Sequence, residues 1–139
     1  MMTLEQQATA VSYLVVASFL GALIGLERER KESNPAGLRT HMLVCVGSCM
    51  FTILSIYAFP DGDSSRVAAQ IITGIGFLGA GVILQGHRRV RNLTTAASIW
   101  ATAAVGMAVG TGAWFFALSA TLIIWIILAV LHRIENKKL

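Results

Sequence analysis

The sequence predicts an all-α membrane protein with five transmembrane helices, its N-terminus outside and its C-terminus in the cytoplasm. Three observations support this prediction: an apolar composition, long stretches without charge, and basic residues on one side. Apolar residues make up 55% of the 139 residues, and charged residues only 13%, roughly half the share typical of a soluble domain. This composition excludes a disordered chain, a disulfide scaffold and a soluble nucleic-acid-binding protein.

Each predicted span is a stretch without charge that can cross the bilayer, which takes about 20 residues. The first three spans are residues 6–26, 42–60 and 67–86. Residues 92–131 are free of charge over about twice the length of one crossing, and Gly110-Thr111-Gly112 predicts a tight turn near their middle. We therefore divide them into spans 93–110 and 113–131, all within one transmembrane domain, residues 1–139.

The basic residues predict the orientation of these spans. Ten of the 11 lie in the gaps after the first and third spans and in the C-terminal tail, and only Arg66 lies on the opposite side. Basic residues of short loops face the cytoplasm. The N-terminus is therefore expected outside and the C-terminus inside, which requires an odd number of spans.

Small residues predict which helices are central. The third and fourth spans are rich in Gly, Ala, Ser and Thr, whereas the fifth is mostly bulky and aliphatic. Because small residues let helices approach closely in lipid, we expect spans three and four at the centre and span five facing lipid. Two ridges of small residues are present, Ala17, Gly21 and Gly25 on the first span and Gly106 and Gly110 on the fourth.

A charged segment closes the first span at the predicted cytoplasmic face. The turn Asn34-Pro35-Ala36-Gly37 follows and lets the first two spans approach each other. The segment is either a solvated helix end or a cluster in which charges near the hydrocarbon pair with arginines that precede the second and fourth spans. The members of this candidate cytoplasmic charged cluster are Glu27, Arg28, Glu29, Arg39 and Arg91.

The third span contains Gly74-Ile-Gly-Phe-Leu-Gly-Ala-Gly81, which includes the pattern G-x-G-x-x-G. A dinucleotide-binding fold would place that pattern after a strand, with an acidic residue about 20 positions further on. The pattern lies inside a predicted span, so we reject this interpretation. Either tight helix packing or a broken helix, whose freed carbonyl groups meet an ion or substrate near the midplane, would explain the glycines.

Polar residues on the third and fourth spans form a candidate intramembrane site. Hydroxyl side chains recur at intervals of four on the fourth span, and those of the third span can bond to them across a packed interface. Structural packing and a polar pathway both remain open. The members of this site are Gln70, Thr73, Gly74, Gly76, Gly79, Gly81, Thr94, Thr95, Ser98 and Thr102.

The other reactive side chains form no recognisable catalytic site. Cys45 and Cys49 share a helix face without nearby His, Asp or Glu, which favours small-residue packing over a redox or metal role. The three histidines, His41, His87 and His132, are expected as anchors at span ends. No nucleophile stands beside a base, so we predict no enzyme activity and no cofactor, and a metal ligand set stays unknown.

Four ordered blocks of the sequence stand out together. They are Gly21-Ala-Leu-Ile-Gly-Leu-Glu-Arg-Glu29, Gly37-Leu-Arg-Thr-His-Met-Leu-Val44 with Gly47-Ser48, Arg66–Leu84 and Leu93–Gly110. In this order and spacing they resemble the membrane domain of the MgtC/SapB family, over residues 17–120. The resemblance implies a multi-pass protein of the bacterial inner membrane, linked to low-magnesium adaptation and, in some pathogens, to survival inside macrophages. It also implies a membrane partner, since at least one member is described as acting on the ATP synthase.

The chain departs from the family pattern in two places. Several members continue into a cytoplasmic domain of ACT type, whereas this sequence stops soon after the fifth span, so regulation through such a domain is expected to be absent or on another chain. The family usually has Gly before the Leu-Thr-Thr block, and here Asn92 occupies that position. Asn tolerates a left-handed backbone better than most residues, so the turn can persist.

These observations lead to two functional hypotheses. The first is a non-enzymatic modulator of a membrane partner, such as the ATP synthase or a transporter, or of membrane energetics, during magnesium, acid or host stress. The alternative is a magnesium or cation channel or transporter whose path is lined by the third and fourth spans. In both, the chain contacts the lipid bilayer, forms a homo-oligomer such as a dimer, and binds no nucleic acid.

Overall fold

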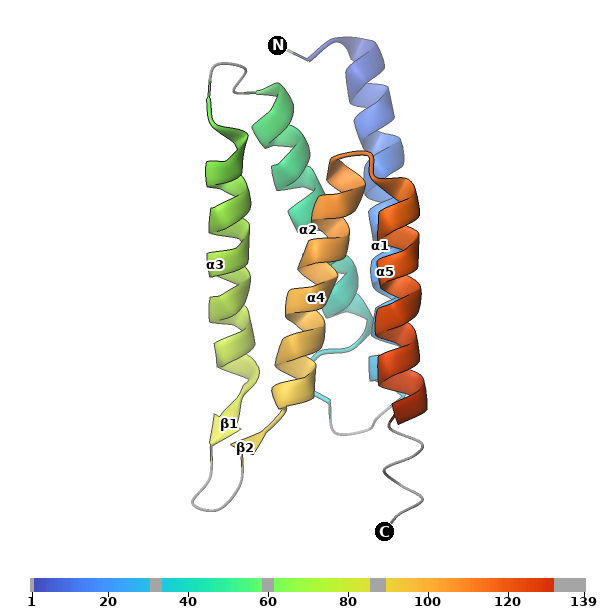
Figure 1. Ribbon diagram of the computed structural model, residues 1–139, viewed down its shortest axis with the longest axis vertical. Helices are drawn as coiled ribbons and strands as arrows, with labels where there is room; N and C mark the ends of the chain where they lie inside the picture. Colours follow the sequence, from blue (N-terminus) through green and yellow to red (C-terminus); the bar gives the residue numbers. More distant parts are fainter. Residues whose placement is uncertain (1, 31–33, 59–61, 86–89, 132–139) are drawn as a thin grey trace.

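The computed structural model describes residues 2–30, 34–58, 62–85 and 90–131. These residues form five α-helices that run up and down, so that the odd-numbered helices all begin at the same end of the bundle (Figure 1). The predicted all-helical architecture is confirmed. The helices are α1 (Leu4–Glu29), α2 (Leu38–Tyr57), α3 (Ser64–Val82), α4 (Leu93–Gly110) and α5 (Trp114–Ile126), and α5 continues as the π-helix η1 (Ile127–Leu131).

Four of the helices, α1 to α4, are long and apolar enough to cross a membrane, and the apolar helix Trp114–Val130 is shorter. The helix α3 ends at Val82, before the predicted end of the third span at residue 86. The chain then forms a short antiparallel ladder that the sequence did not predict, in which β1 (Leu84–Gln85) pairs with β2 (Val90–Arg91). This ladder joins α3 to α4 at the end of the bundle where α1 also ends (Figure 1).

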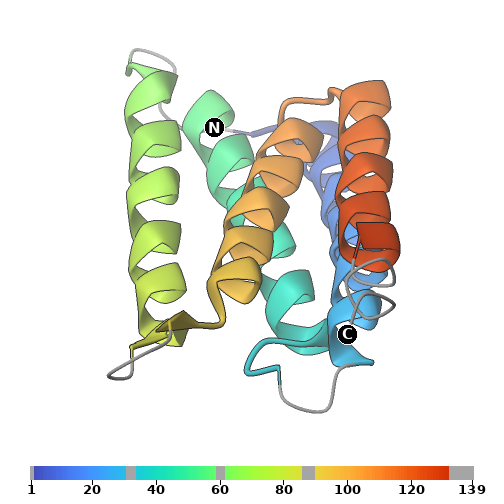
Figure 2. The same cartoon turned by 60° about the horizontal axis from the view of Figure 1, so that its bottom comes forward.

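The central helices are α2 and α4. Figure 2 shows α4 in the middle of the bundle, α3 alone at one edge, and α1 and α5 on the other side. In their most apolar stretches, 56% of α4 and 44% of α2 are buried, but only 11% of α3. The expectation that the third span is central is therefore wrong, whereas α5 is peripheral as predicted and exposes Phe115, Phe116 and Ile123.

Both small-residue ridges, on α1 and on α4, pack closely against α2. A methyl group at Gly21 of α1 would come within 2.8 Å of the Cys45 Cβ atom, and one at Gly110 of α4 within 2.8 Å of the Cys49 carbonyl oxygen. Gly106 lies directly against the Cys45 backbone. Both cysteines are fully buried between the ridges, which agrees with the packing role predicted for them.

The glycines of α3 behave differently. The helix is continuous from Ser64 to Val82, so the alternative of a broken helix is wrong. A methyl group at Gly74, Gly76 or Gly81 would meet no atom within 4 Å, and one at Gly79 would meet only Ala96, at 3.7 Å. Within one protomer, tight helix packing can explain only Gly79. At the other three glycines, no atom of another helix lies close to α3.

Local backbone chemistry explains how α3 is connected. Asp63 precedes the helix and accepts a hydrogen bond from the Ser65 N–H (2.9 Å), and bonding to Ser65 lowers the pKa of its carboxyl group. At the other end, Asn92 adopts the left-handed conformation (φ 66°), as its sequence position suggested. Its side-chain amide donates to the Val82 carbonyl (3.1 Å) and satisfies one carbonyl that the end of α3 leaves free.

Candidate functional site

A cluster of polar side chains, all buried except the half-buried Asn34, lies where α1 ends and α2 and α4 begin. It combines residues from three helices and from the turn between α1 and α2. We call it the buried polar cluster; its members are Arg28, Asn34, His41, Thr95, Ser98 and Thr102.

Arg28 links α1 to α4 and to the turn. Its guanidinium group donates to the Asn34 Oδ1 atom (2.9 Å) and to the Thr95 Oγ1 atom (2.6 Å). The Asn34 amide in turn donates to the Arg28 carbonyl oxygen (2.9 Å) and so caps the end of α1. Only 3% of Arg28 is exposed, so these contacts replace the water that would otherwise surround the charge.

The side-chain hydrogen bonds of Arg28 go to neutral groups. Within the described residues, the closest ion pair at this end joins Glu27 to Arg30 (3.5 Å) and leaves Arg28 out. Its buried Nε atom has no hydrogen-bond partner there. The last turn of α1 supplies partial negative charge from its free carbonyl groups, which stabilises a cation at this position.

His41 joins α2 to α4 inside the bundle. Its Nδ1 atom lies 2.8 Å from the Gly37 carbonyl oxygen, and its Nε2 atom lies 3.0 Å from the Ser98 hydroxyl. A carbonyl oxygen only accepts hydrogen bonds, so Nδ1 carries the hydrogen. His41 is fully buried, and the expectation that it anchors the membrane interface is wrong.

The bonds around His41 remain satisfied in two protonation states. The Ser98 hydroxyl also lies within 2.8 Å of the Thr95 carbonyl oxygen. With a neutral imidazole, Ser98 donates to Nε2; with a protonated imidazole, Nε2 donates to Ser98, and Ser98 donates to Thr95.

The predicted cytoplasmic charged cluster is only partly assembled. The Glu29 carboxylate accepts a hydrogen bond from the Leu38 N–H (2.7 Å) at the start of α2, where free N–H groups favour a negative charge. Gly37 provides the space, since a side chain there would collide with Glu29. Arg39 and Arg91 are exposed and make no side-chain hydrogen bond or ion pair with the cluster among the described residues.

The predicted intramembrane site is divided between two environments. Thr95, Ser98 and Thr102 are buried in α4, where Thr102 donates to the Ser98 carbonyl oxygen (2.7 Å). Gln70 and Thr94 are exposed. The third exposed residue, Thr73, bonds within its own helix to Ala69, so no hydrogen bond joins α3 to the α4 hydroxyl groups within the described residues. Instead, the Arg28–Thr95 bond connects the two candidate sites.

Two members of the buried polar cluster, Asn34 and His41, were missed as site residues. Asn34 was assigned only to a turn. The second span was predicted to begin at residue 42, but α2 begins at Leu38, so His41 lies within the helix. In the sequence, His41 follows Gly37 by four residues and Ser98 follows Thr94 by four, which places each pair on one face of its helix. This spacing within a helix does not show which faces of α2 and α4 meet.

Comparison with known proteins places this multi-pass helical chain in a family. The model of the MgtC family matches residues 14–137. The chain belongs to the MgtC family, which confirms the resemblance seen in the sequence blocks. No solved structure matches the chain.

Several curated relatives are similar over most of this chain. The protein named "Putative magnesium transporter YhiD" of Escherichia coli (strain K12) is 41% identical over 129 residues, which cover 87% of this chain and 60% of the relative. "Protein MgtC" of Salmonella typhimurium (strain LT2) is 49% identical over 111 residues, or 80% of this chain and 47% of the relative. "Protein MgtC" of Brucella abortus (strain 2308) is 45% identical over 125 residues, or 90% and 52%. The chain thus spans about half the length of these relatives.

Proposed function

We propose that this chain is a non-enzymatic modulator of a membrane partner in the bacterial inner membrane, acting in adaptation to low magnesium or related stress. The observation that carries this proposal is the distribution of polar groups. The buried charge of Arg28 and the hydrogen bonds of His41 lie at one end of the bundle, and the core that follows combines apolar residues such as Leu20 and Val109 with hydroxyl groups such as Thr52 and Thr121 that bond within their own helices. Among the described residues this core contains no acidic side chain, which a cation path through a membrane usually has.

The exposed arginines at that end are the proposed contact surface. The side chain of Arg30 is 71% exposed, and Arg39 and Arg91 are exposed beside the starts of α2 and α4. Arg28 and Glu29 hold the helix ends in place beneath them. A membrane protein with acidic cytoplasmic loops, such as the ATP synthase or a transporter, would have the complementary charge.

A magnesium or cation channel is the second candidate. The relative named "Putative magnesium transporter YhiD" favours it, as does the line of hydroxyl groups from Thr95 to Thr102 in α4. Any path along α3 would pass Arg66 at the start of that helix, where a positive charge repels Mg²⁺.

A flux assay in liposomes separates the two candidates. We expect vesicles that contain the protein and an internal Mg²⁺ indicator to take up Mg²⁺ no faster than empty vesicles. Uptake above that background, reduced by the Gln70→Leu substitution, would contradict the modulator proposal. An ionophore added at the end confirms that the vesicles are intact and the indicator responds.

Affinity capture from bacterial membranes tests the contact surface. We expect one membrane protein to co-purify in a constant ratio, and Arg39→Glu together with Arg91→Glu to reduce the amount captured. Arg66→Glu is the matched control, because it makes the same change at the opposite end of the bundle. Equal loss with all three substitutions would contradict a contact at the proposed surface.

A further inference from the structure

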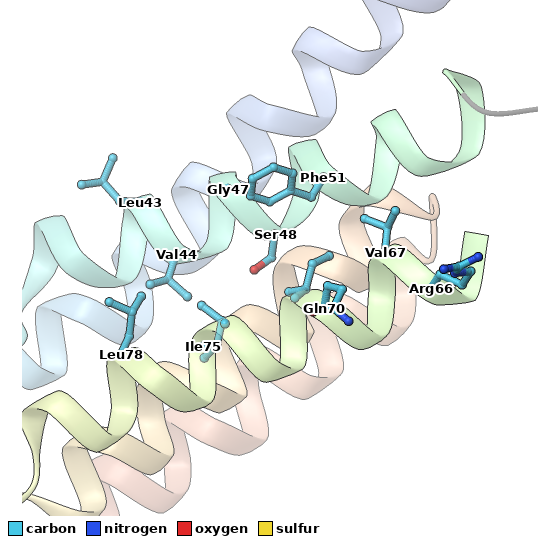
Figure 3. Close-up of a pocket in the computed structure, with 12 residues that line it drawn as sticks. Leu43, Val44, Gly47, Ser48, Phe51, Arg66, Val67, Gln70, Ile75 and Leu78 are labelled. Carbon is cyan, nitrogen blue, oxygen red and sulfur yellow. The ribbon is translucent and has the colours of Figure 1, made fainter. Parts of the chain in front are cut away.

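A cleft between α2 and α3 lies apart from the buried polar cluster (Figure 3). Its volume is about 690 Å³. The walls are mostly apolar, with Val44 and Phe51 on α2 and Ile75 and Leu78 on α3. Since both helices are apolar enough to cross a membrane, the cleft is open to acyl chains rather than to water.

The cleft has the length of one membrane leaflet. Its lining on α3 runs from Arg66, in the first turn of the helix, to Leu78. At 1.5 Å per residue this is about 18 Å, close to half of a hydrocarbon core of about 30 Å. Arg66 therefore lies at headgroup level when Leu78 lies near the middle of the bilayer.

Polar groups are present at the Arg66 end and part of the way along the cleft. Arg66 is exposed, and it forms no ion pair with any described residue. Gln70 follows one turn below it. Ser48 of α2 is 3% exposed; its hydroxyl points into the cleft towards α3 (Figure 3) and has no hydrogen-bond partner in the described part of the chain.

We propose that this cleft binds one anionic phospholipid. One acyl chain lies along the apolar walls, the phosphate group contacts Arg66, and the ester carbonyl groups accept hydrogen bonds from Gln70 and Ser48. Gly47 and Gly74 leave room for the chain, because a methyl group at either position would meet no atom within 4 Å. The positive charge at the mouth matches the phosphate and excludes a cation.

The charge also disfavours a second copy of this chain as the occupant. A symmetric dimer formed across α3 would bring the same surface of both protomers together. The two Arg66 side chains would then lie at the same depth in the membrane, where like charges repel. A lipid phosphate in that position instead neutralises the arginine.

Native mass spectrometry of the full chain tests the charge requirement. The protein in detergent is titrated with phosphatidylglycerol or with phosphatidylcholine of the same acyl chains. We expect tighter binding of one phosphatidylglycerol molecule, and about fivefold weaker binding after Arg66→Gln, the fold-change that corresponds to about 1 kcal/mol for one basic residue near an anionic surface. Equal binding of the two lipids, or no change after Arg66→Gln, would overturn the proposal.

Two substitutions on α3 test the position of the lipid. Gly74→Leu fills the cleft, whereas Gly76→Leu adds the same side chain to open space outside it. We expect Gly74→Leu to abolish the bound phosphatidylglycerol and Gly76→Leu to leave it unchanged. Equal binding by both variants would overturn the proposal. So would conversion of a dimer to a monomer by Gly74→Leu with lipid binding retained, since a second copy would then cover this face.

Discussion

Arg28 is a buried cation, and its side-chain hydrogen bonds go to neutral partners. Its guanidinium group depends on two oxygen atoms, Asn34 Oδ1 and Thr95 Oγ1, and on its place in the last turn of α1. A buried charge loses much more than a neutral group when a hydrogen bond is removed. A substitution that removes one of these hydrogen bonds is therefore expected to lower the free energy of unfolding strongly.

Replacing Thr95 tests this dependence. Thr95→Val keeps the shape of the side chain but removes the hydroxyl that Arg28 contacts at 2.6 Å. We expect a loss of about 1.5–3 kcal/mol in the free energy of unfolding, the range for hydrogen bonds to charged groups. Thermal or denaturant unfolding in detergent, followed by tryptophan fluorescence, measures the loss.

Thr94→Val is the matched control for this prediction. Thr94 is the neighbouring residue in the same helical turn, and its side chain is exposed. Its substitution should leave the free energy of unfolding within about 0.5 kcal/mol of the original value. Equal destabilisation by both variants would mean that the contact with Arg28 contributes little.

At the scale of single residues, a repeat of hydroxyl groups along one helix does not show which of them face the protein. Ser98 and Thr102 of the fourth span are buried, but Thr94 in the same series is exposed. The partner of Ser98 is His41, 57 positions away, and a periodic pattern within one helix carries no information about the facing helix. The paired charges were expected to include Arg39 and Arg91, yet water or headgroups can solvate both at an exposed helix start.

At the scale of elements, glycines on two helices let α1 and α4 pack closely against α2. Gly21 and Gly25 belong to α1, and Gly106 and Gly110 belong to α4. In lipid such close approach is a main source of helix association, because apolar surfaces gain little from leaving an apolar solvent. The close packing of α1, α2 and α4 thus depends on these glycines.

A pair of Gly→Ala substitutions tests this role. Gly106→Ala would bring its methyl group into the Cys45 backbone, and we expect destabilisation of about 1–3 kcal/mol, as found for overpacked cores. Gly81→Ala adds the same methyl group where no atom lies within 4 Å. It should stabilise α3 by up to about 1 kcal/mol, since Ala favours helix over Gly. Unfolding in detergent measures both, and a neutral Gly106→Ala would contradict the packing account.

The number of helices and the turn at Gly110-Thr111-Gly112 were correctly predicted, because charge-free length and glycine are local properties. The placement of α3 was not. Its glycines resemble those of α4 in the sequence, but a small residue only permits a close approach and does not supply a partner. The strand pair formed by β1 and β2 was missed because two-residue strands have no periodicity to detect.

At the scale of the whole molecule, the up-and-down order places the start of α1 and the end of η1 at opposite ends of the bundle (Figure 1). With basic residues concentrated at one end, we expect the N-terminus outside and the C-terminus in the cytoplasm. Alkaline phosphatase fused within the α2–α3 loop, at Gly62, should be active, and green fluorescent protein fused to the C-terminus should fluoresce. The reverse pair of signals would contradict this orientation.

The helices of the bundle differ in how closely they pack against one another. Main-chain atoms of α2 touch the glycines of α1 and α4, so the spacing of these three helices cannot change without breaking backbone contacts. By contrast, α3 packs less tightly: its end residues Ser64 and Val82 accept hydrogen bonds from Ser55 and Asn92, and Ile75 packs against the cluster that contains Val44. Any motion that transmits a signal across the membrane is therefore expected to involve displacement of α3 against a stationary three-helix block.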